Sequence, residues 1–465
     1  MNEVLEREYT GFAEGNQEML ESLYKALEAG AGVDPALFTG AGMAGRAMTP
    51  ESLDTTLVNV LWSQDEAKLF KALKKQAVKS PVHQWAKRTG VGNTDGAWVA
   101  EGGDSQEADQ SISRKYVTMK YLQTLRKVTL QATVTNMLED AIASEKMAGT
   151  LWIIQQIEKV LFEGDSAVVE EEPDGLIKLI TGTDNIIDVR GKDASSVEFE
   201  NAITQGCRVI RAKYGIATDL YSSLKVMEDV QRLLRDRIRF PAGVTEASSI
   251  FTKYPTPFGK PELIDDIFIL EGDEGVASLL TTDRPSQPTI ASATAAASGG
   301  LESKFFANDV GSYYYQVAHV NEYGLSQLSA EVQCAAVAAD EKVTITITDG
   351  ATPGTGVFLF RGKKDAAASQ PKLFFVKAAY DGPDQEVIDL NHDLPGTSSA
   401  FLLNLNPMYD AMRWLQFLPM MKFDLYPTNA AVIPFLMLLF GALGLKKEEQ
   451  TVRIKNIQPS GLGWY

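Results

Sequence analysis

Cysteine is nearly absent from this 465-residue chain. Cys207 and Cys334 lie far apart, and neither belongs to a C-x-x-C pair. The sequence therefore predicts neither a disulfide framework nor a thiolate zinc site, and a reducing cytoplasm is the simplest compartment. Histidine is equally scarce: His83, His319 and His392 show no i, i+4 spacing, so we predict no metal site and interpret them as surface or structural residues.

The sequence also lacks an export signal and a membrane-spanning run. The N-terminus opens with acidic residues, where a secretory signal needs a basic segment followed by an apolar one. The most apolar stretch, residues 430–445, is shorter than the ~20 residues of a spanning helix and contains Pro434 and Gly441. We therefore predict no membrane partner and interpret this stretch as buried core.

Positive charge is in deficit. The chain has 44 Lys and Arg against 61 Asp and Glu, a formal charge of −17. Proteins that follow a phosphate backbone need clustered basic residues, so we do not expect sequence-specific nucleic-acid binding. The hydrophobic fraction of 45% is that of a globular protein, and the length predicts two or three domains.

Signatures of catalysis are missing as well. Residues 40–45 match G-x-G-x-x-G, but an acidic helix and Asp34-Pro35 precede them instead of the buried strand of a dinucleotide site. No G-x-S-x-G elbow occurs, and the acidic residues 170–174 lack the ligand spacing of an EF-hand loop. We predict no enzyme and no cofactor; the enzyme alternative would rest on residues 40–45 alone.

Charge is divided unevenly along the chain. Residues 1–35, which include a predicted amphipathic helix, hold two basic and eight acidic residues. Residues 74–127 hold ten basic and five acidic residues, are punctuated by glycine, and alternate like a strand at 116–121. This pattern predicts a long β-hairpin that buries itself poorly, and the opposite charges suggest that the two segments meet between copies of the chain.

The strongest helical pattern covers residues 136–162. Asn136 and Glu139 can form a capping box, Gly164 follows the end, and the predicted length is roughly 40 Å. Beyond it, we predict a strand at 176–180, two helices within 198–240 and a β-rich segment at 264–270.

Residues 285–395 differ in sequence pattern from the segments on either side. Helical periodicity disappears, and short alternating runs appear at 312–320, 342–348, 357–361 and 373–377. About 110 residues of short strands is the size of an immunoglobulin-like sandwich. Tyr313 to Ser326 resembles the fibronectin type III pattern, in which a tyrosine-bearing strand runs into Asn-x-x-Gly-x-Ser. We predict an inserted β-domain, after which the host domain resumes at Phe401.

Several short motifs occur in one consistent order. They are Trp98-Val99-Ala100-Glu101-Gly102-Gly103, Tyr116-Val117-Thr118-Met119-Lys120-Tyr121, Asp174-Gly175-Leu176, Tyr214-Gly215-Ile216-Ala217-Thr218-Asp219-Leu220-Tyr221, Leu418-Pro419-Met420-Met421-Lys422, Phe440-Gly441-Ala442-Leu443 and Arg453-Ile454-Lys455-Asn456. This collinear set resembles the major capsid proteins of tailed bacteriophages, which have the Hong Kong 97-type fold. It is most similar to those of large contractile-tailed, Twort-like phages, over nearly the full length.

The resemblance implies an α+β chain with six parts. They are an N-terminal arm (1–73), an extended β-hairpin loop (74–127), a peripheral domain with a long spine helix (128–195), an axial domain (196–284), the inserted Ig-like, fibronectin III-like β-sandwich (285–395) and a C-terminal return to the axial and peripheral domains (396–465).

The function that the resemblance implies is assembly and not catalysis. Copies would form hexamers and pentamers of an icosahedral head shell around the phage genome, with a portal, a scaffold and a decoration protein as further partners and only non-specific contact with DNA. The expected localisation is the virion capsid, assembled in the host cytoplasm. The expected inter-subunit contacts lie on the extended loop, at Trp98, Glu101, Lys87, Arg88, Arg114 and Lys115.

Two alternatives remain at this point. An encapsulin-like nanocompartment shell would share the fold but hold a cargo enzyme. A tail or baseplate protein would instead use the Ig-like module for adhesion.

Overall fold

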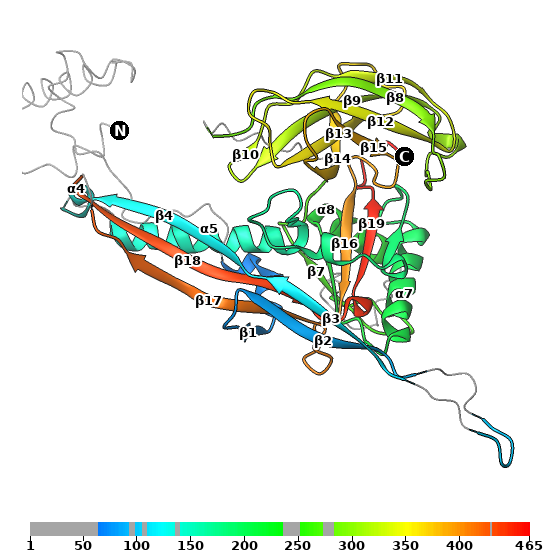
Figure 1. Ribbon diagram of the computed structural model, residues 1–465, viewed down its shortest axis with the longest axis horizontal. Helices are drawn as coiled ribbons and strands as arrows, with labels where there is room; N and C mark the ends of the chain where they lie inside the picture. Colours follow the sequence, from blue (N-terminus) through cyan, green and yellow to red (C-terminus); the bar gives the residue numbers. More distant parts are fainter. Residues whose placement is uncertain are drawn as a thin grey trace, which may run out of the picture. The chain divides into compact units, whose positions relative to one another are not determined.

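The computed structural model describes residues 64–92, 98–104, 109–134, 140–235, 252–272, 283–427 and 430–465. The predicted N-terminal helix, the glycine-rich segment 40–45 and most of the predicted arm 1–73 lie outside the described residues. The described chain is a mixture of helices and strands, as predicted (Figure 1).

One four-stranded sheet joins segments that are distant in the sequence. Its order is β1 (Lys75–Ala77), β17 (Met412–Asp424), β18 (Val432–Leu445) and β4 (Lys120–Thr129). The central strand β18 pairs antiparallel with both β17 and β4. The apolar stretch 430–445 thus becomes a strand whose side chains contribute to the largest buried core, as predicted for core.

Helix α5 (Ala141–Glu163) packs against β4 and β18 (Figure 1). Asp140 caps it by accepting a hydrogen bond from the N–H of Ile142 at 3.0 Å, and it ends at Gly164. The predicted helix and its C-terminal end are confirmed, and 23 residues give a length of roughly 35 Å. The predicted start is wrong, because Asp140 and not Asn136 is the N-cap of α5. Asn136 and Glu139 themselves lie outside the described residues.

A second, five-stranded sheet has the order β5 (Ile186–Asp188), β19 (Val452–Ile457), β16 (Ser398–Leu403), β6 (Asp219–Ser222) and β7 (Glu262–Asp265). Its core includes the buried faces of α7 (Val197–Ala212) and α8 (Leu224–Arg235). The two helices predicted within 198–240 are confirmed as far as Arg235, beyond which the chain is not described.

Residues 289–389 form two antiparallel sheets around their own core. One contains β10 (Gly324–Leu325), β9 (Gly311–Asn321), β11 (Val332–Val337), β13 (Gly356–Gly362) and β14 (Lys372–Ala379); the other contains β15 (Gln385–Asp389), β12 (Glu341–Thr348) and β8 (Thr289–Ala297). All four predicted strands are confirmed. In the Asn-x-x-Gly-x-Ser turn, the Asn321 side chain accepts from the N–H of Tyr323, and Ser326 Oγ accepts from that of His319.

The remaining pair of strands, β2 (Val82–Gly90) and β3 (Ser111–Thr118), forms a separate antiparallel hairpin. The predicted range 74–127 is therefore divided, because β1 and β4 belong to the four-stranded sheet. Met119, buried between β3 and β4, marks the division. Short helices complete the described chain: α3 (Lys68–Ala72), α4 (Leu130–Val134), α6 (Leu176–Leu179) and the 3-10 turns η2 (Gln64–Glu66), η3 (Thr183–Asn185), η4 (Ala307–Asp309) and η5 (Glu448–Gln450).

Two further sequence predictions are wrong. The predicted strand at 176–180 is instead the helix α6, which ends at Leu179, and Leu176 and Ile177 enter the core from its single turn. A short apolar run does not distinguish a strand from a helical turn. Residues 264–270 are strand only as far as Asp265. Asp266 then accepts a hydrogen bond from the N–H of Phe268 and ends the strand in a turn.

Among the described helices, none has the length and apolar character needed to cross a bilayer.

Candidate functional site

The β2–β3 hairpin carries four of the six predicted contact residues, and it divides them between two faces. Ala86 stands opposite Arg114 in the antiparallel register. Because successive side chains of a strand alternate between faces, Arg88 lies on the same face as Ala86 and Arg114. Lys87 and Lys115, each one residue away, lie on the opposite face.

The face with Lys87 and Lys115 is turned toward the rest of the chain. Lys87 forms an ion pair with Glu449, and the Lys115 ammonium lies 3.7 Å from the Glu448 carboxylate. Glu448 also accepts hydrogen bonds of 2.8 Å from the N–H groups of residues 181 and 182. Partial burial opposes ionisation of Glu448, but these hydrogen bonds and Lys115 outweigh it and hold its pKa below the usual value. These contacts fix the hairpin within one chain.

The other face is exposed. Ile112 is 57% exposed and Tyr116 70% exposed, and both lie beside Arg88 and Arg114. In the part of the chain that the structure describes, neither arginine forms an ion pair. We call these four residues, with Trp98, the outer hairpin surface.

Trp98 and Glu101 belong to the connection between β2 and β3, part of which is described. Trp98 is 98% exposed, an unusual position for the largest apolar side chain. Glu101 is exposed in a turn that the N–H of Gly103 closes by donating to the carbonyl of Ala100 at 2.9 Å.

Sequence reasoning selected the basic residues but not their faces. It also missed Ile112 and Tyr116, although alternation along β3 could have placed both with Arg114. Glu448 and Glu449 are more than 300 residues from the hairpin in sequence, and no local signal connects them to it.

A second candidate region is the junction between residues 289–389, which we call the two-sheet unit, and the rest of the chain. Val168 and Val169, from the loop after α5, are buried against Ala318, Val320 and Phe360 of the β9–β13 sheet. This apolar contact attaches the outer surface of that sheet to the end of α5.

Arg190 strengthens the junction from the turn after β5. Its guanidinium donates to the carbonyls of Asn391 and Lys304, both at 2.9 Å, and pairs with Asp309 at 3.2 Å. Lys304 in turn pairs with Asp188 at 3.0 Å. The two units are therefore joined by a charged network in addition to the apolar contact.

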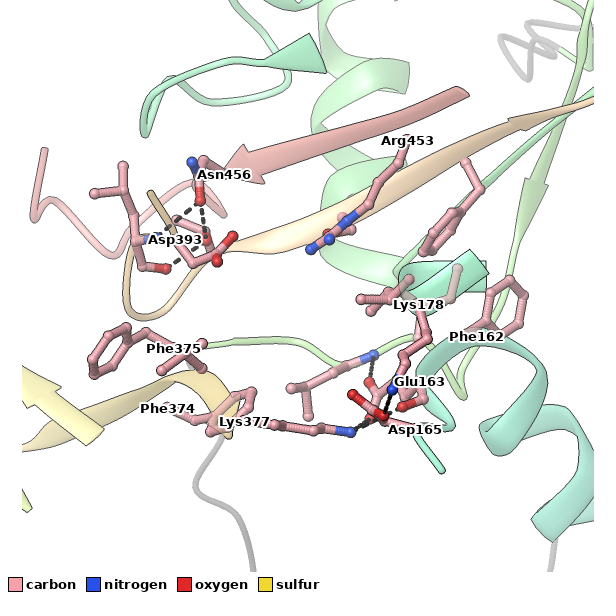
Figure 2. A pocket seen from close by; sticks show the side chains of 18 of the residues that line it. Phe162, Glu163, Asp165, Lys178, Phe374, Phe375, Lys377, Asp393, Arg453 and Asn456 are labelled. Atoms are coloured by element: carbon pink, nitrogen blue, oxygen red, sulfur yellow. Dashed lines mark hydrogen bonds and ion pairs between the residues drawn. The ribbon is translucent and has the colours of Figure 1, made fainter. Parts of the chain in front are cut away.

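Figure 2 shows a cavity of about 160 Å³ at this junction, lined by the end of α5, α6, β14, β16 and β19. Lys178 forms an ion pair with Asp165, and Lys377 donates to the Glu163 carbonyl at 3.1 Å. The lining contains three basic and three acidic side chains, with Asp393 the third acid and Arg453 the third base. The charged side chains of the lining therefore have no net charge.

Arg453 differs from the two lysines of this cavity, because its hydrogen-bond partner is a neutral side chain. Its Nε and Nη2 lie 3.2 and 3.1 Å from Ser399 Oγ, and among the described residues no carboxylate lies within 4.0 Å of it. Burial lowers the pKa of Arg453 below its usual value, although Asp393 partly offsets this effect.

Motif positions from the sequence have structural roles. Asp174 accepts hydrogen bonds from the N–H and hydroxyl of Ser166 at 3.0 and 2.7 Å. A Cβ on Gly175 would lie 2.5 Å from the Val160 carbonyl oxygen, so only glycine fits there. Thr218 accepts from the N–H of Leu405 at 2.9 Å, which fixes the start of β6.

A buried acidic pair lies beneath α3. Both carboxyl oxygens of Glu158 accept backbone hydrogen bonds, from Leu69 at 2.6 Å and Phe70 at 2.9 Å. Burial, together with the nearby charge of Asp266, raises the pKa of Glu158 to about 9. Burial also raises the pKa of Asp266 to about 6.

The chain is similar in sequence to capsid proteins of phages. The chain is 24% identical over 461 residues to the major capsid proteins of Staphylococcus phages K and S25-3, covering 94% of this chain and 95% of each of those proteins. A protein of Enterococcus phage phiEF24C is 25% identical over 463 residues. No protein-family model matches the chain.

The chain also matches solved structures of shell proteins, with little sequence in common. The capsid of a native GTA particle covers 90% of this chain with 9% identity and a TM-score of 0.49. The capsid structure of Mycobacterium phage Bobi covers 88% with 9% identity and a TM-score of 0.44, and the SrpI encapsulin complex of Synechococcus elongatus covers 91% with 9% identity and a TM-score of 0.40.

Proposed function

We infer that this chain is a major capsid protein of a bacteriophage, a structural subunit that assembles with copies of itself into the head shell. The observation that carries the inference is the similarity to capsid proteins over 94% of the chain and 95% of theirs. Because the match extends over nearly the whole of both chains, it covers all the parts of the protein in the same order and is not limited to one shared domain.

The Hong Kong 97-type fold gives the described elements their roles. Helix α5 is the spine helix, and the four-stranded sheet with it forms the peripheral domain. The five-stranded sheet with α7 and α8 forms the axial domain, and the β2–β3 hairpin is the extended loop. The observed return of β16 to β19 into both sheets supports this assignment.

Residues 285–395 form an inserted domain of the immunoglobulin or fibronectin III type. The two antiparallel sheets around one core and the Asn321-centred turn support this classification. The junction at Val168, Val169 and Arg190 holds the insert on the host domain.

The outer hairpin surface contacts a neighbouring copy. Its residues are exposed and combine two arginines with three large apolar side chains. The four that belong to the strands lie opposite the face that the chain itself uses. Trp98 serves as the apolar anchor, and Arg88 and Arg114 meet acidic groups that set register and association rate. Lys87 and Lys115 contribute indirectly, by holding the hairpin through Glu448 and Glu449.

The wider assembly follows from the same assignment. Hexamers and pentamers form an icosahedral shell in the host cytoplasm, with portal, scaffold and decoration proteins as partners and with non-specific contact to packaged DNA. The net charge of −17 favours a wall that does not bind DNA tightly. We assign no catalytic role to the chain.

Negative-stain electron microscopy tests this function. The full chain is expressed alone and with its neighbouring genes. Closed shells, or rings with five- and six-fold symmetry, are expected. Monomers under every condition would favour the tail or baseplate alternative, and shells that enclose a cargo enzyme would favour the encapsulin alternative.

A further inference from the structure

A second cavity, of about 360 Å³, lies where the C-terminal segment meets the two-sheet unit and the turn after β5. We call it the basic cavity. The charged side chains of its lining are Arg190, Lys192, Arg361, Lys363, Lys364 and one acid, Asp309; Tyr313 and Tyr465 also line it. Five basic side chains around one acidic side chain contrast with a protein whose net charge is −17.

Arg361 forms the floor of the basic cavity. It is 1% exposed, and it donates to Asp389 at 2.6 Å and to Asn391 at 2.7 Å through its two terminal nitrogens. Its Nε is buried and has no hydrogen-bond partner among the described residues. Arg361 therefore places a guanidinium at the floor of the cavity, and its charge is balanced by Asp389.

Three lysines on the rim, Lys192, Lys363 and Lys364, form no ion pair within 4.0 Å among the described residues. Lys363 donates to the carbonyl of Gly463 at 2.8 Å and Lys364 to that of Asn308 at 2.7 Å. Within the described residues, Lys192 is exposed and forms no ion pair. Arg190 is the one basic lining residue that pairs with Asp309.

The cavity walls are aromatic. Phe306, Tyr313 and Trp464 line it, and the Arg190 and Arg361 guanidinium groups lie 4.8 and 5.0 Å from the rings of Phe306 and Tyr313. Apolar walls limit water and strengthen the attraction between a bound anion and the lysines.

We propose that the basic cavity binds a small phosphate-type anion, inorganic phosphate or pyrophosphate, which joins the insert, the turn after β5 and the C-terminal segment. Guanidinium and ammonium donors are the groups that bind phosphate oxygens, and a volume of about 360 Å³ admits such an anion with water. The net negative charge opposes a polymer of phosphates, so we assign the site to a free anion. The proposal does not depend on the capsid assignment.

Isothermal titration calorimetry of the full chain with pyrophosphate, at constant ionic strength, tests the proposal. We expect saturable binding and a rise of about 3 °C in the unfolding midpoint at saturation. The double substitution Lys363→Gln with Lys364→Gln keeps side-chain donors for the two carbonyls but removes two charges, and it should weaken binding at least tenfold. The matched control, Lys253→Gln with Lys260→Gln, removes two exposed charges elsewhere and should bind like the wild type.

Several results would overturn the proposal. One is the absence of binding at millimolar pyrophosphate, and another is equal binding by the double variant and its control. Displacement of pyrophosphate by a short single-stranded oligonucleotide would refute the assignment to a free anion. If the double variant does not fold, Lys192→Gln replaces it, because that exposed lysine has no ion pair to lose; unchanged affinity would again count against the site.

Discussion

Glu158 shows what a single residue contributes to the main core. It is fully buried in α5, yet its carboxyl group does not form an ion pair within the described residues. Instead it accepts hydrogen bonds from the N–H groups of Leu69 and Phe70 and so holds α3 against α5. Because burial and Asp266 raise its pKa to about 9, the folded chain keeps a proton that the unfolded chain releases near pH 4.5.

The consequence is a stability that falls as pH rises. Between pH 4.5 and about 9 the folded state binds more protons than the unfolded state, so the free energy of unfolding decreases with pH through this window. Glu158→Gln cannot titrate. We expect the loss in unfolding midpoint between pH 5.5 and 8.5 to be smaller in this variant than in the wild type.

Differential scanning fluorimetry across that range measures the effect. Glu228→Gln, which removes an exposed carboxylate from α8, is the control and should keep the wild-type slope. Equal slopes in Glu158→Gln and wild type would show that Glu158 is ionised in the folded chain.

Gly175 provides a steric test at the same scale. An added Cβ would meet the backbone at 2.5 Å from the Val160 oxygen and 2.7 Å from the Gly164 nitrogen, and backbone atoms there have no room to move. We expect Gly175→Ala to lower the free energy of unfolding by about 1–3 kcal/mol or more. Gly259→Ala, where the nearest atom is 3.4 Å away, is the control, and chemical denaturation of both variants measures the difference.

At the scale of the elements, the two faces of the β2–β3 hairpin have different contacts. Its inner face contacts Glu448 and Glu449 of the same chain, whereas its outer face has no partner in the described residues. Charge reversal should therefore have opposite consequences on the two faces.

Lys115→Glu places a negative charge beside Glu448 and should lower the free energy of unfolding of the unassembled subunit by about 1 kcal/mol, the scale of a partly exposed ion pair. Arg114→Glu should change that free energy by less than about 0.5 kcal/mol but reduce the yield of shells. Denaturation of the subunit and sedimentation of shells separate the two effects. Normal shell yield from Arg114→Glu would contradict the proposed contact.

The elements that could be predicted are those with a clear physical signal in the sequence. The 3.6-residue period and Gly164 identify α5 and its end, and alternation identifies β9, β12, β13 and β14. Helix α6 was missed because one turn is too short to show a period. The partners of the hairpin and the protonation of Glu158 were out of reach, since both depend on segments that only the folded chain brings together.

At the scale of the whole molecule, the exposed Trp98 is expected to contribute binding energy to the assembled shell. Large aromatic side chains that become buried on association contribute most of the binding energy of an interface. We expect Trp98→Ala to leave the subunit's unfolding midpoint unchanged but to raise the subunit concentration needed for assembly at least tenfold. Met408→Ala, which truncates another side chain that is 91% exposed, is the control for light-scattering assays of assembly. Equal assembly of Trp98→Ala and wild type would remove Trp98 as an anchor.

The return of β16 to β19 into both host sheets also determines when the chain can fold during its synthesis. The five-stranded sheet needs residues 398–457 between strands that were made two hundred residues earlier, and the four-stranded sheet needs β17 and β18 to join β1 to β4. On the ribosome, the contiguous unit of residues 289–389 can fold first, while the cores on either side wait for the last strands to emerge. The late strands thus set the time of folding: a nascent chain does not present a finished subunit to its neighbours until β19 has been translated.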